Sequence, residues 1–237
     1  MSQEHHFTLY THTHGPNGWK VVIVLEELGL DYDSKYLVFD KGEQKSPEYT
    51  KYNPNGRIPT LIDHKNNDFV IWESGAIITY LAEKYDPEGK ISATSFEGKI
   101  QQLQWLMFQA SGQGPYFGQV GWFMRYHPEK IPSAIERYQK EVLRVLGVLN
   151  DVLSKQEWLV GDKCTVADLS LIPWNAYALM DGGLLKDREV NFEADYPAFY
   201  KWHRALMSRE AVKKTFAIRD EAYIIIAVNV SKAADAG

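Results

Sequence analysis

The side chains that could carry chemistry near the N-terminus of this chain are hydroxyl, amide and imidazole groups. Cys164 is the single cysteine among 237 residues, so an intrachain disulfide and a cysteine nucleophile near the N-terminus are both excluded. His12 and His14 alternate in one expected loop, and His5 and His6 lie near the chain end. Pairs of imidazoles lack the third and fourth ligands that a zinc site needs. The pattern therefore predicts no metal and no cysteine-based catalysis.

Ser74 lies where a helix is expected to begin, directly after the apolar run Phe69–Trp72. Free backbone amides and the positive end of the helix dipole attract a carboxylate at such a position. Glu73, one residue earlier, could accept hydrogen bonds from an ammonium group. On the residues alone, a capping serine and a first-turn charge are the commoner reading of this pair.

The elements that must position these residues alternate between strand and helix over the first 90 residues. Period-two and helical spacings, with Gly, Pro and Asn at the turns, predict the order βαβαββα, a small α/β layer with mixed strand directions. The expected strands are Phe7–Tyr10, Tyr32–Phe39, Thr60–Asp63 and Phe69–Trp72; the expected helices are Lys20–Gly29, a short one opened by Ser46-Pro47, and Ser74–Tyr85.

The chain changes character after Asp86-Pro87-Glu88-Gly89, which reads as a linker. Long helical periodicity over residues 94–120 and 132–154 predicts an all-helical second half. Thr165 and Asp168 are spaced as a capping box that opens another helix, with Cys164 as its hydrophobic staple. We expect domains at residues 1–87 and 94–237, and the segment 218–230 stays unassigned.

Composition narrows the classes of partner. The formal net charge is −5, which gives no electrostatic footprint for nucleic acid or an anionic membrane surface. The longest apolar run, Ala222–Val228, is far shorter than a membrane span. The first residues show neither the basic nor the apolar part of a secretory signal. We expect a cytoplasmic protein without nucleic-acid or membrane partners.

Several motifs in order carry a family resemblance. A βαβαββα domain with Ile58-Pro59 before its hairpin and Glu73-Ser74 at its last helix, followed by a helical domain, resembles a cytosolic glutathione transferase. The fold implied is a thioredoxin-like α/β domain plus an all-α domain. Within that superfamily the chain is similar to the bacterial Nu class and to the fungal branch related to the yeast nitrogen-catabolite regulator. The motifs are residues 15–18, 72–76, 103–106 and 134–138.

The resemblance implies that glutathione is the co-substrate and assigns its contacts. Glu73 and Ser74 would bind the γ-glutamyl end, and the backbone of Ile58, before an expected cis proline, would pair with the cysteinyl residue. Gln44 is the closest match for the group that binds the glycyl carboxylate, and Arg57 and Lys45 could either help to bind it or be surface charges. Arg137 would reach the glutathione site, and Gln104 would reach it from the partner subunit of an expected homodimer.

The thiol needs a group that favours its ionised form, because a free thiol has a pKa near 8.5. The hypothesis is that the Asn17 side-chain amide donates to the sulfur, beside the start of the first helix; a plain cap or turn role for Asn17 is the alternative. Thr13 and Tyr10 remain open as other thiol partners. Gly15 has no hydroxyl, which excludes a serine-type mechanism at that position.

The helical half is expected to supply the wall for the second substrate. Phe108, Tyr116, Phe117 and Trp122 are the candidates, although any single aromatic is more often core, and the Ser111–Pro115 break is expected to open a pocket toward Asn17. The predicted activity is glutathione-dependent disulfide or peroxide reduction, or glutathione transfer to small hydrophobic electrophiles. The alternatives are a ligand-carrying or a regulatory binding protein on the same scaffold.

Overall fold

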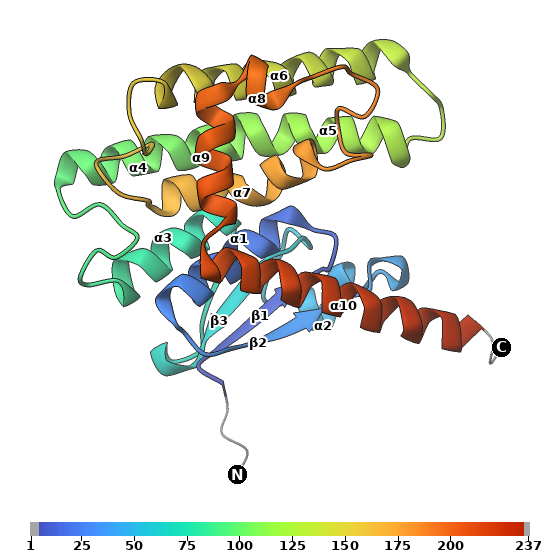
Figure 1. The fold of residues 1–237 in the computed structure, drawn as a ribbon. Helices are drawn as coiled ribbons and strands as arrows, with labels where there is room; N and C mark the ends of the chain where they lie inside the picture. The colour runs from blue at the N-terminus through green and yellow to red at the C-terminus, as the bar shows by residue number, and fades with distance from the viewer. Residues whose placement is uncertain (1–4, 235–237) are drawn as a thin grey trace. The chain divides into compact units, whose positions relative to one another are not determined.

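The computed structural model describes residues 5–234, with side chains as far as residue 224. The chain forms two compact units, which are described separately. The first unit contains the residues up to Tyr85 and returns at Arg209, and the second runs from Asp86 to Ser208. The expected combination of an α/β layer and an all-helical part is confirmed (Figure 1).

The first unit is built on a four-stranded mixed sheet in the order β2-β1-β3-β4. Its strands are β1 (Phe7–Thr11), β2 (Tyr32–Tyr36), β3 (Thr60–Asp63) and β4 (Phe69–Trp72). β1 runs parallel to β2 and antiparallel to β3, which pairs antiparallel with β4. Alternate residues of β1, beginning with Phe7 and Leu9, are buried, while Tyr10 lies on the opposite face.

Helices cover this sheet at positions close to those expected. α1 (Pro16–Leu28) begins earlier than its apolar spacing indicates and ends at Gly29, whose φ of 64° is the left-handed conformation that glycine adopts readily. α3 (Ser74–Tyr85) packs against α1. Short pieces fill the connections: η1 (Phe39–Lys41), η2 (Glu43–Lys45), α2 (Pro47–Thr50) and η3 (His64–Asn66).

The unassigned tail forms a long helix, α10 (Glu210–Ala234). It packs along α1, and the bidentate pair between Arg209 and the buried Glu27 ties the two together. The C-terminal segment therefore belongs with the first unit, whereas the sequence placed it in the helical part 94–237. The physical reason is that the buried face of α1 requires a partner that the sheet alone does not supply.

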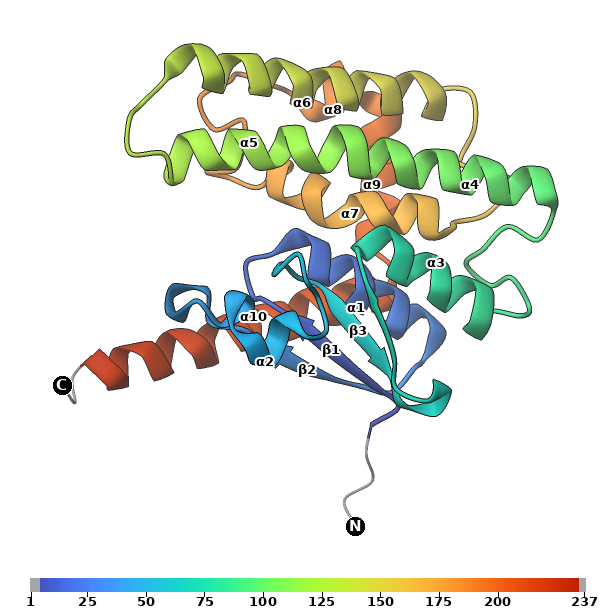
Figure 2. The ribbon, with the colours of Figure 1, turned by 180° about the vertical axis from the view of Figure 1, so that it is seen from behind.

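The second unit is a bundle of α4 (Phe96–Phe108), α5 (Gly114–Arg125), α6 (Pro132–Leu153), α7 (Val166–Leu179), α8 (Phe192–Asp195) and α9 (Pro197–Met207). α6 packs along α5, and α9 crosses α6 and α7 (Figure 2). Thr165 and Asp168 form the predicted capping box at the start of α7. Within the described residues, no helix combines the length and the apolar character that crossing a bilayer requires.

The expected break at Ser111–Pro115 does not occur. A π-helical segment, η4 (Gln109–Gln113), carries α4 into α5 without interruption. Gln113 is fully buried, and its Nε2 donates to the Leu171 carbonyl at 3.1 Å and to Asn175 Oδ1 at 2.8 Å. The Gln113 side chain is tolerated in the interior because these hydrogen bonds satisfy its buried amide nitrogen.

Candidate functional site

The start of α1 is the first part of the candidate site. Gly15 occupies the N-cap position, Pro16 the first helical position and Asn17 the second. Gly15 provides no capping side chain, and the first turn contains no acidic residue. The positive end of the helix is therefore available to attract an anion, and Asn17 is the second residue of this first turn.

Ile58 lies directly against this helix start. A Cβ atom added to Gly15 would come within 2.8 Å of Ile58 Cδ1, so the two residues are in close contact. The Ile58–Pro59 peptide bond is cis, as the resemblance implied. The preceding Arg57 carbonyl accepts hydrogen bonds from the Tyr49 hydroxyl and from Asn53 Nδ2, which hold this segment in place.

Glu73 and Ser74 form the third part, at the start of α3. Glu73 has a φ of 72°, a conformation uncommon for a residue other than glycine, and its side chain is exposed. Ser74 is buried and accepts a hydrogen bond from Lys20 Nζ at 3.3 Å. Lys20 is one turn beyond Asn17 on α1, so this bond links the two helix starts that carry the candidate residues.

Lys20 is a residue that sequence analysis missed. Only 2% of its surface is exposed, and burial lowers the pKa of its amine to about 7, against the opposing effect of Glu73. A signal was available, because Lys20 directly precedes the buried apolar run Val21–Leu25. A charge at the head of such a run is most often read as solvated surface, and here it is interior.

The residues expected at the glycyl carboxylate lie on neighbouring segments. A Cβ atom on Gly56 would meet the Gln44 carbonyl at 2.8 Å, which places Gln44 beside the segment that carries the exposed Arg57. Gln44 Oε1 is buried and has no hydrogen-bond partner among the described residues. Lys45 is engaged differently, since its Nζ donates to the Asn55 carbonyl at 3.0 Å.

The two alternative thiol partners have other contacts. The Tyr10 ring lies 5.5 Å from that of Tyr49 and 5.7 Å from that of Tyr52, and burial, with help from Tyr52, raises the pKa of its hydroxyl. The raised pKa keeps the Tyr10 hydroxyl protonated at neutral pH, so Tyr10 could act toward a thiolate only as a hydrogen-bond donor. Thr13 is buried, and its hydroxyl lies 3.2 Å from His14 Nδ1.

The candidates in the helical unit have very different exposure. Gln104 and Arg137 are exposed, and Phe108 and Tyr116 are half-buried. Trp122 is 48% exposed and stacks on Tyr126 at 6.1 Å between ring centroids. Phe117, in contrast, is fully buried edge-on against Trp174, so it belongs to the core of this unit and not to a substrate wall.

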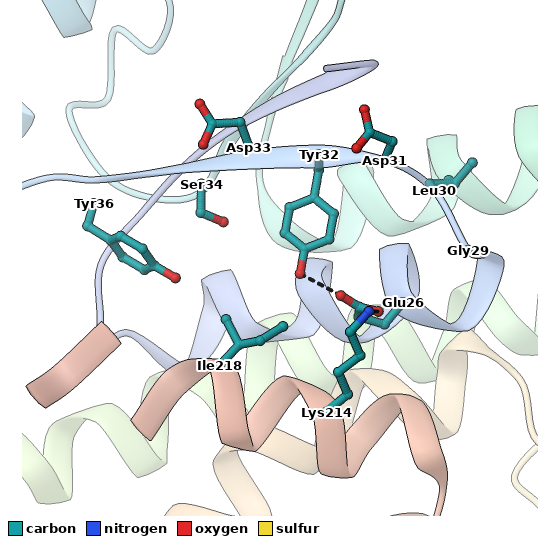
Figure 3. Close-up of a pocket in the computed structure, with 10 residues that line it drawn as sticks. All are labelled: Glu26, Gly29, Leu30, Asp31, Tyr32, Asp33, Ser34, Tyr36, Lys214 and Ile218. Carbon is teal, nitrogen blue, oxygen red and sulfur yellow. Dashed lines mark hydrogen bonds and ion pairs between the residues drawn. The ribbon is translucent and has the colours of Figure 1, made fainter. Parts of the chain in front are cut away.

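A separate cavity of about 660 Å³ lies between the end of α1, β2 and α10 in the first unit (Figure 3). Its main polar groups pair with one another: Tyr32 donates to Glu26 Oε1 at 2.8 Å, and Lys214 Nζ lies 2.7 Å from Glu26 Oε2. None of the candidate site residues lines it. In the part of the chain that the structure describes, no three His, Cys, Asp or Glu side chains gather as metal ligands would.

Comparison with known proteins matches both units. Residues 5–83 match the family model of the glutathione S-transferase N-terminal domain, and residues 115–210 match that of the C-terminal domain. Glutathione S-transferase 1 of Schizosaccharomyces pombe is 51% identical over 223 residues, covering 91% of this chain and 97% of that protein.

Solved structures agree. The glutathione transferase URE2P6 from Phanerochaete chrysosporium, in complex with oxidized glutathione, has a TM-score of 0.87 and 59% identity, covering 93% of this chain and 99% of that one. Ure2p5 from the same fungus, cocrystallized with 1-(S-glutathionyl)-2,4-dinitrobenzene, has a TM-score of 0.87 and 51% identity, covering 94% and 98%. The resemblance found in the sequence is confirmed, and the chain belongs to the glutathione S-transferase family.

Proposed function

We propose that this chain binds glutathione in its first unit and activates the thiol at the start of α1. The observation that carries this is the placement of Asn17 in an uncapped first turn whose N-cap, Gly15, touches Ile58. In this arrangement the backbone of Ile58 would pair with the cysteinyl residue of glutathione. The thiol would then lie near Asn17 and near the positive end of the α1 dipole.

The remaining contacts follow from the same placement. Ser74 and the first amides of α3 would bind the γ-glutamyl carboxylate, and Glu73 would accept from the ammonium group. Gln44 and Arg57, on adjacent segments, would take the glycyl carboxylate. We also propose, on the family resemblance, that Arg137 and Gln104 of the helical unit make outer contacts with glutathione. Phe108, Tyr116 and Trp122 remain candidates for the second-substrate wall.

Asn17 would act by stabilising the thiolate. Lowering the thiol pKa by about 2 units corresponds to about 2.7 kcal/mol of preferential stabilisation of the ionised form. One amide hydrogen bond to a charged sulfur, together with a helix N-terminus, is sufficient for an effect of this size.

The reaction proposed is the reduction of a small disulfide by two glutathione molecules. The first thiolate attacks one sulfur of the substrate, forming a mixed disulfide and releasing a thiolate that takes up a proton. A second glutathione thiolate attacks the glutathione sulfur of the mixed disulfide, giving oxidised glutathione and the second free thiol. The chain supplies no cysteine before Cys164, so both electrons come from glutathione. Reduced glutathione points to a reducing compartment such as the cytoplasm.

Two relatives support this choice and one further activity. One is in complex with oxidized glutathione, the product of the proposed reduction. Another is cocrystallized with a conjugate of glutathione and a dinitrobenzene, the product class of transfer to an aryl electrophile. We therefore propose glutathione transfer to small electrophiles as a second reaction of the same thiolate, and peroxide reduction as a third.

The proposal includes a homodimer. Phe96, Ile100, Leu103 and Met107 recur along α4 at helical spacing, and all four are exposed, from 43% for Leu103 to 74% for Phe96. A continuous apolar stripe of this kind is typical of a surface that a second copy covers.

The deciding experiment replaces Asn17. Asn17→Ala should reduce disulfide turnover by about 10- to 100-fold, because it removes one hydrogen bond to a charged acceptor. The pH dependence of thiolate absorbance in the bound complex should move to higher pH with it. Tyr10→Phe and Thr13→Val serve as matched controls. Unchanged turnover in Asn17→Ala, with loss in either control, would exclude Asn17 as the thiol partner. Binding without any turnover would favour a ligand-carrying protein.

A further inference from the structure

Lys20 is buried at a place where packing alone does not require a charge. It is 2% exposed, and its amine lies 3.3 Å from Ser74 Oγ at the first residue of α3. Lysine is almost never fully buried unless it is paired, because removing an ammonium group from water is costly. An aliphatic side chain would fill the same space at lower cost, so the amine is retained for a polar role.

The chemistry of the Lys20–Ser74 contact determines the direction of the hydrogen bond. An ammonium group has three donors and no acceptor, so Ser74 Oγ must accept whenever Lys20 is protonated. The hydrogen of the serine hydroxyl is then directed elsewhere as a donor. The first amides of α3 are donors as well, and this first turn contains no acidic residue. Protonated Lys20 therefore leaves Ser74 and its helix start as a set of donors only.

We propose that Lys20 is a positioning residue for glutathione. The protonated amine of Lys20 holds the Ser74 hydroxyl as a donor toward the γ-glutamyl carboxylate of glutathione. The inference rests on the proposed function, because it assigns the ligand that Ser74 meets. It also makes binding and protonation reciprocal: the carboxylate favours the protonated amine, and the protonated amine favours the carboxylate.

Proton uptake is the consequence. Burial lowers the pKa of Lys20 to about 7, with Glu73 opposing the change, so near neutral pH part of the free protein carries a neutral amine. A bound carboxylate raises that pKa again, and the complex takes up protons from solution. The elements packed against α1 carry other charged and titratable groups. These include Glu73 before α3, Tyr80, Glu83, Lys84 and Tyr85 within α3, the Glu27–Arg209 and Glu26–Lys214 pairs with α10, and His12 and His14 ahead of α1.

The test uses S-methylglutathione, whose blocked thiol cannot titrate. Calorimetry near about pH 7, in buffers of different ionisation enthalpy, should show uptake of a fraction of a proton by the wild-type protein. In Lys20→Met this uptake should disappear. Affinity should fall about tenfold or more at about pH 6, where the wild-type amine is charged, and much less at about pH 8.5. The pH titration of the Lys20 ε-carbon signal should shift upward on binding.

The controls separate the outcomes. Lys213→Met makes the same change at an exposed lysine of α10 and should leave uptake and affinity unchanged. An apolar replacement of a buried charge is usually tolerated, and a thermal melt checks that Lys20→Met folds. A double-mutant cycle with Ser74→Ala should show that the two losses are not additive.

Two results would overturn these assignments separately. If the wild-type protein does not bind S-methylglutathione, the proposed function itself is wrong. If the wild-type protein binds S-methylglutathione without taking up protons, the role of Lys20 is wrong while the glutathione site stands. The same holds if proton uptake persists in Lys20→Met and disappears in His14→Asn.

Discussion

Glu73 adopts a φ of 72°, in the left-handed region where a side chain other than glycine costs free energy. Asn67 and Asp68 also have positive φ, but they lie in the hairpin connection between β3 and β4, where such conformations are common for Asn and Asp. Glu73 has no comparable turn to explain it, and it directly precedes the helix start assigned to the γ-glutamyl group. The strain therefore coincides with the candidate site.

Replacing Glu73 should separate stability from binding. Glu73→Gly should raise the free energy of unfolding by about 1 kcal/mol, because glycine adopts this φ without a steric penalty. Glutathione affinity should fall by about tenfold through loss of the acceptor for the ammonium group. Urea unfolding and calorimetry measure the two effects. Asn67→Gly is the matched control and should leave affinity unchanged; a Glu73→Gly protein that binds as well as wild type would remove Glu73 from the site.

The positions of the candidate site residues were predictable from sequence only where a motif fixes them. Asn17 follows a proline that fits the first helical position, and Glu73-Ser74 stands at the junction between an apolar strand and a helix. Phe117 and Lys20 stand in no such motif, although Lys20 directly precedes the apolar run Val21–Leu25. The sequence pattern of an aromatic residue on a helix is the same whether its ring packs in the core or contacts a substrate. A lysine at the start of an apolar run is most often expected to extend to solvent.

His203 is the buried titratable group of α9 that no part of the proposed reaction uses. It is 5% exposed, stacks on Phe199 with ring centroids 5.9 Å apart, and its Nδ1 is buried with no hydrogen-bond partner among the described residues. Burial, with a smaller effect from Arg204, lowers its pKa to about 4. The neutral ring is therefore the form that the folded helical unit accommodates.

The pH dependence of stability follows from this difference. An unfolded histidine protonates near pH 6.5 and the folded one only near about 4, so the unfolded state binds more protons in between. Stability should therefore fall as the pH drops from about 6.5 toward 4, by up to about 3 kcal/mol from this residue. Urea unfolding across that range should show a shallower decline for His203→Leu than for wild type. His127→Leu is the control and should lose stability as steeply as wild type. An equally steep loss in His203→Leu would contradict the contribution assigned to His203.

Elements with explicit end signals were predicted well, and elements without them were not. The capping box of Thr165 and Asp168 marked the start of α7 because both side chains act locally. The run 111–115 suggested a break because glycine and proline usually interrupt helices, yet the buried bonds of Gln113 carry the helix through it. α10 escaped assignment because its apolar residues 224–226 are consecutive and lack a helical period.

The apolar stripe on α4 belongs to the scale of the whole assembly. Leu103→Arg should weaken the proposed homodimer by about 100-fold or more, because it would bury an unpaired charge between two copies. Sedimentation at micromolar concentration should change from dimer to monomer. Ser133→Arg, which adds the same charge at an exposed position of α6, should leave the dimer intact. A wild-type protein that sediments as a monomer would exclude the homodimer.

The division of the chain into an α/β part and a helical part was visible in sequence, because the spacing of apolar residues changes near residue 86. The sequence did not show that the segment from Arg209 onward returns to the first unit. Whether a C-terminal helix packs on the nearest preceding helices or on a distant one depends on which surface is left uncovered. Only the folded α1, with Glu27 buried and facing Arg209, identifies that surface.

Arg209 meets Glu27 across 182 positions of the chain, and this separation sets an order for synthesis on the ribosome. α1 is translated before the segment Asp86–Ser208, and the helix that packs along it is translated after that segment. The second unit, Asp86–Ser208, is continuous in sequence, whereas the first unit is made of two separate stretches of the chain. The first unit therefore acquires α10 only after the whole of the second unit has been translated.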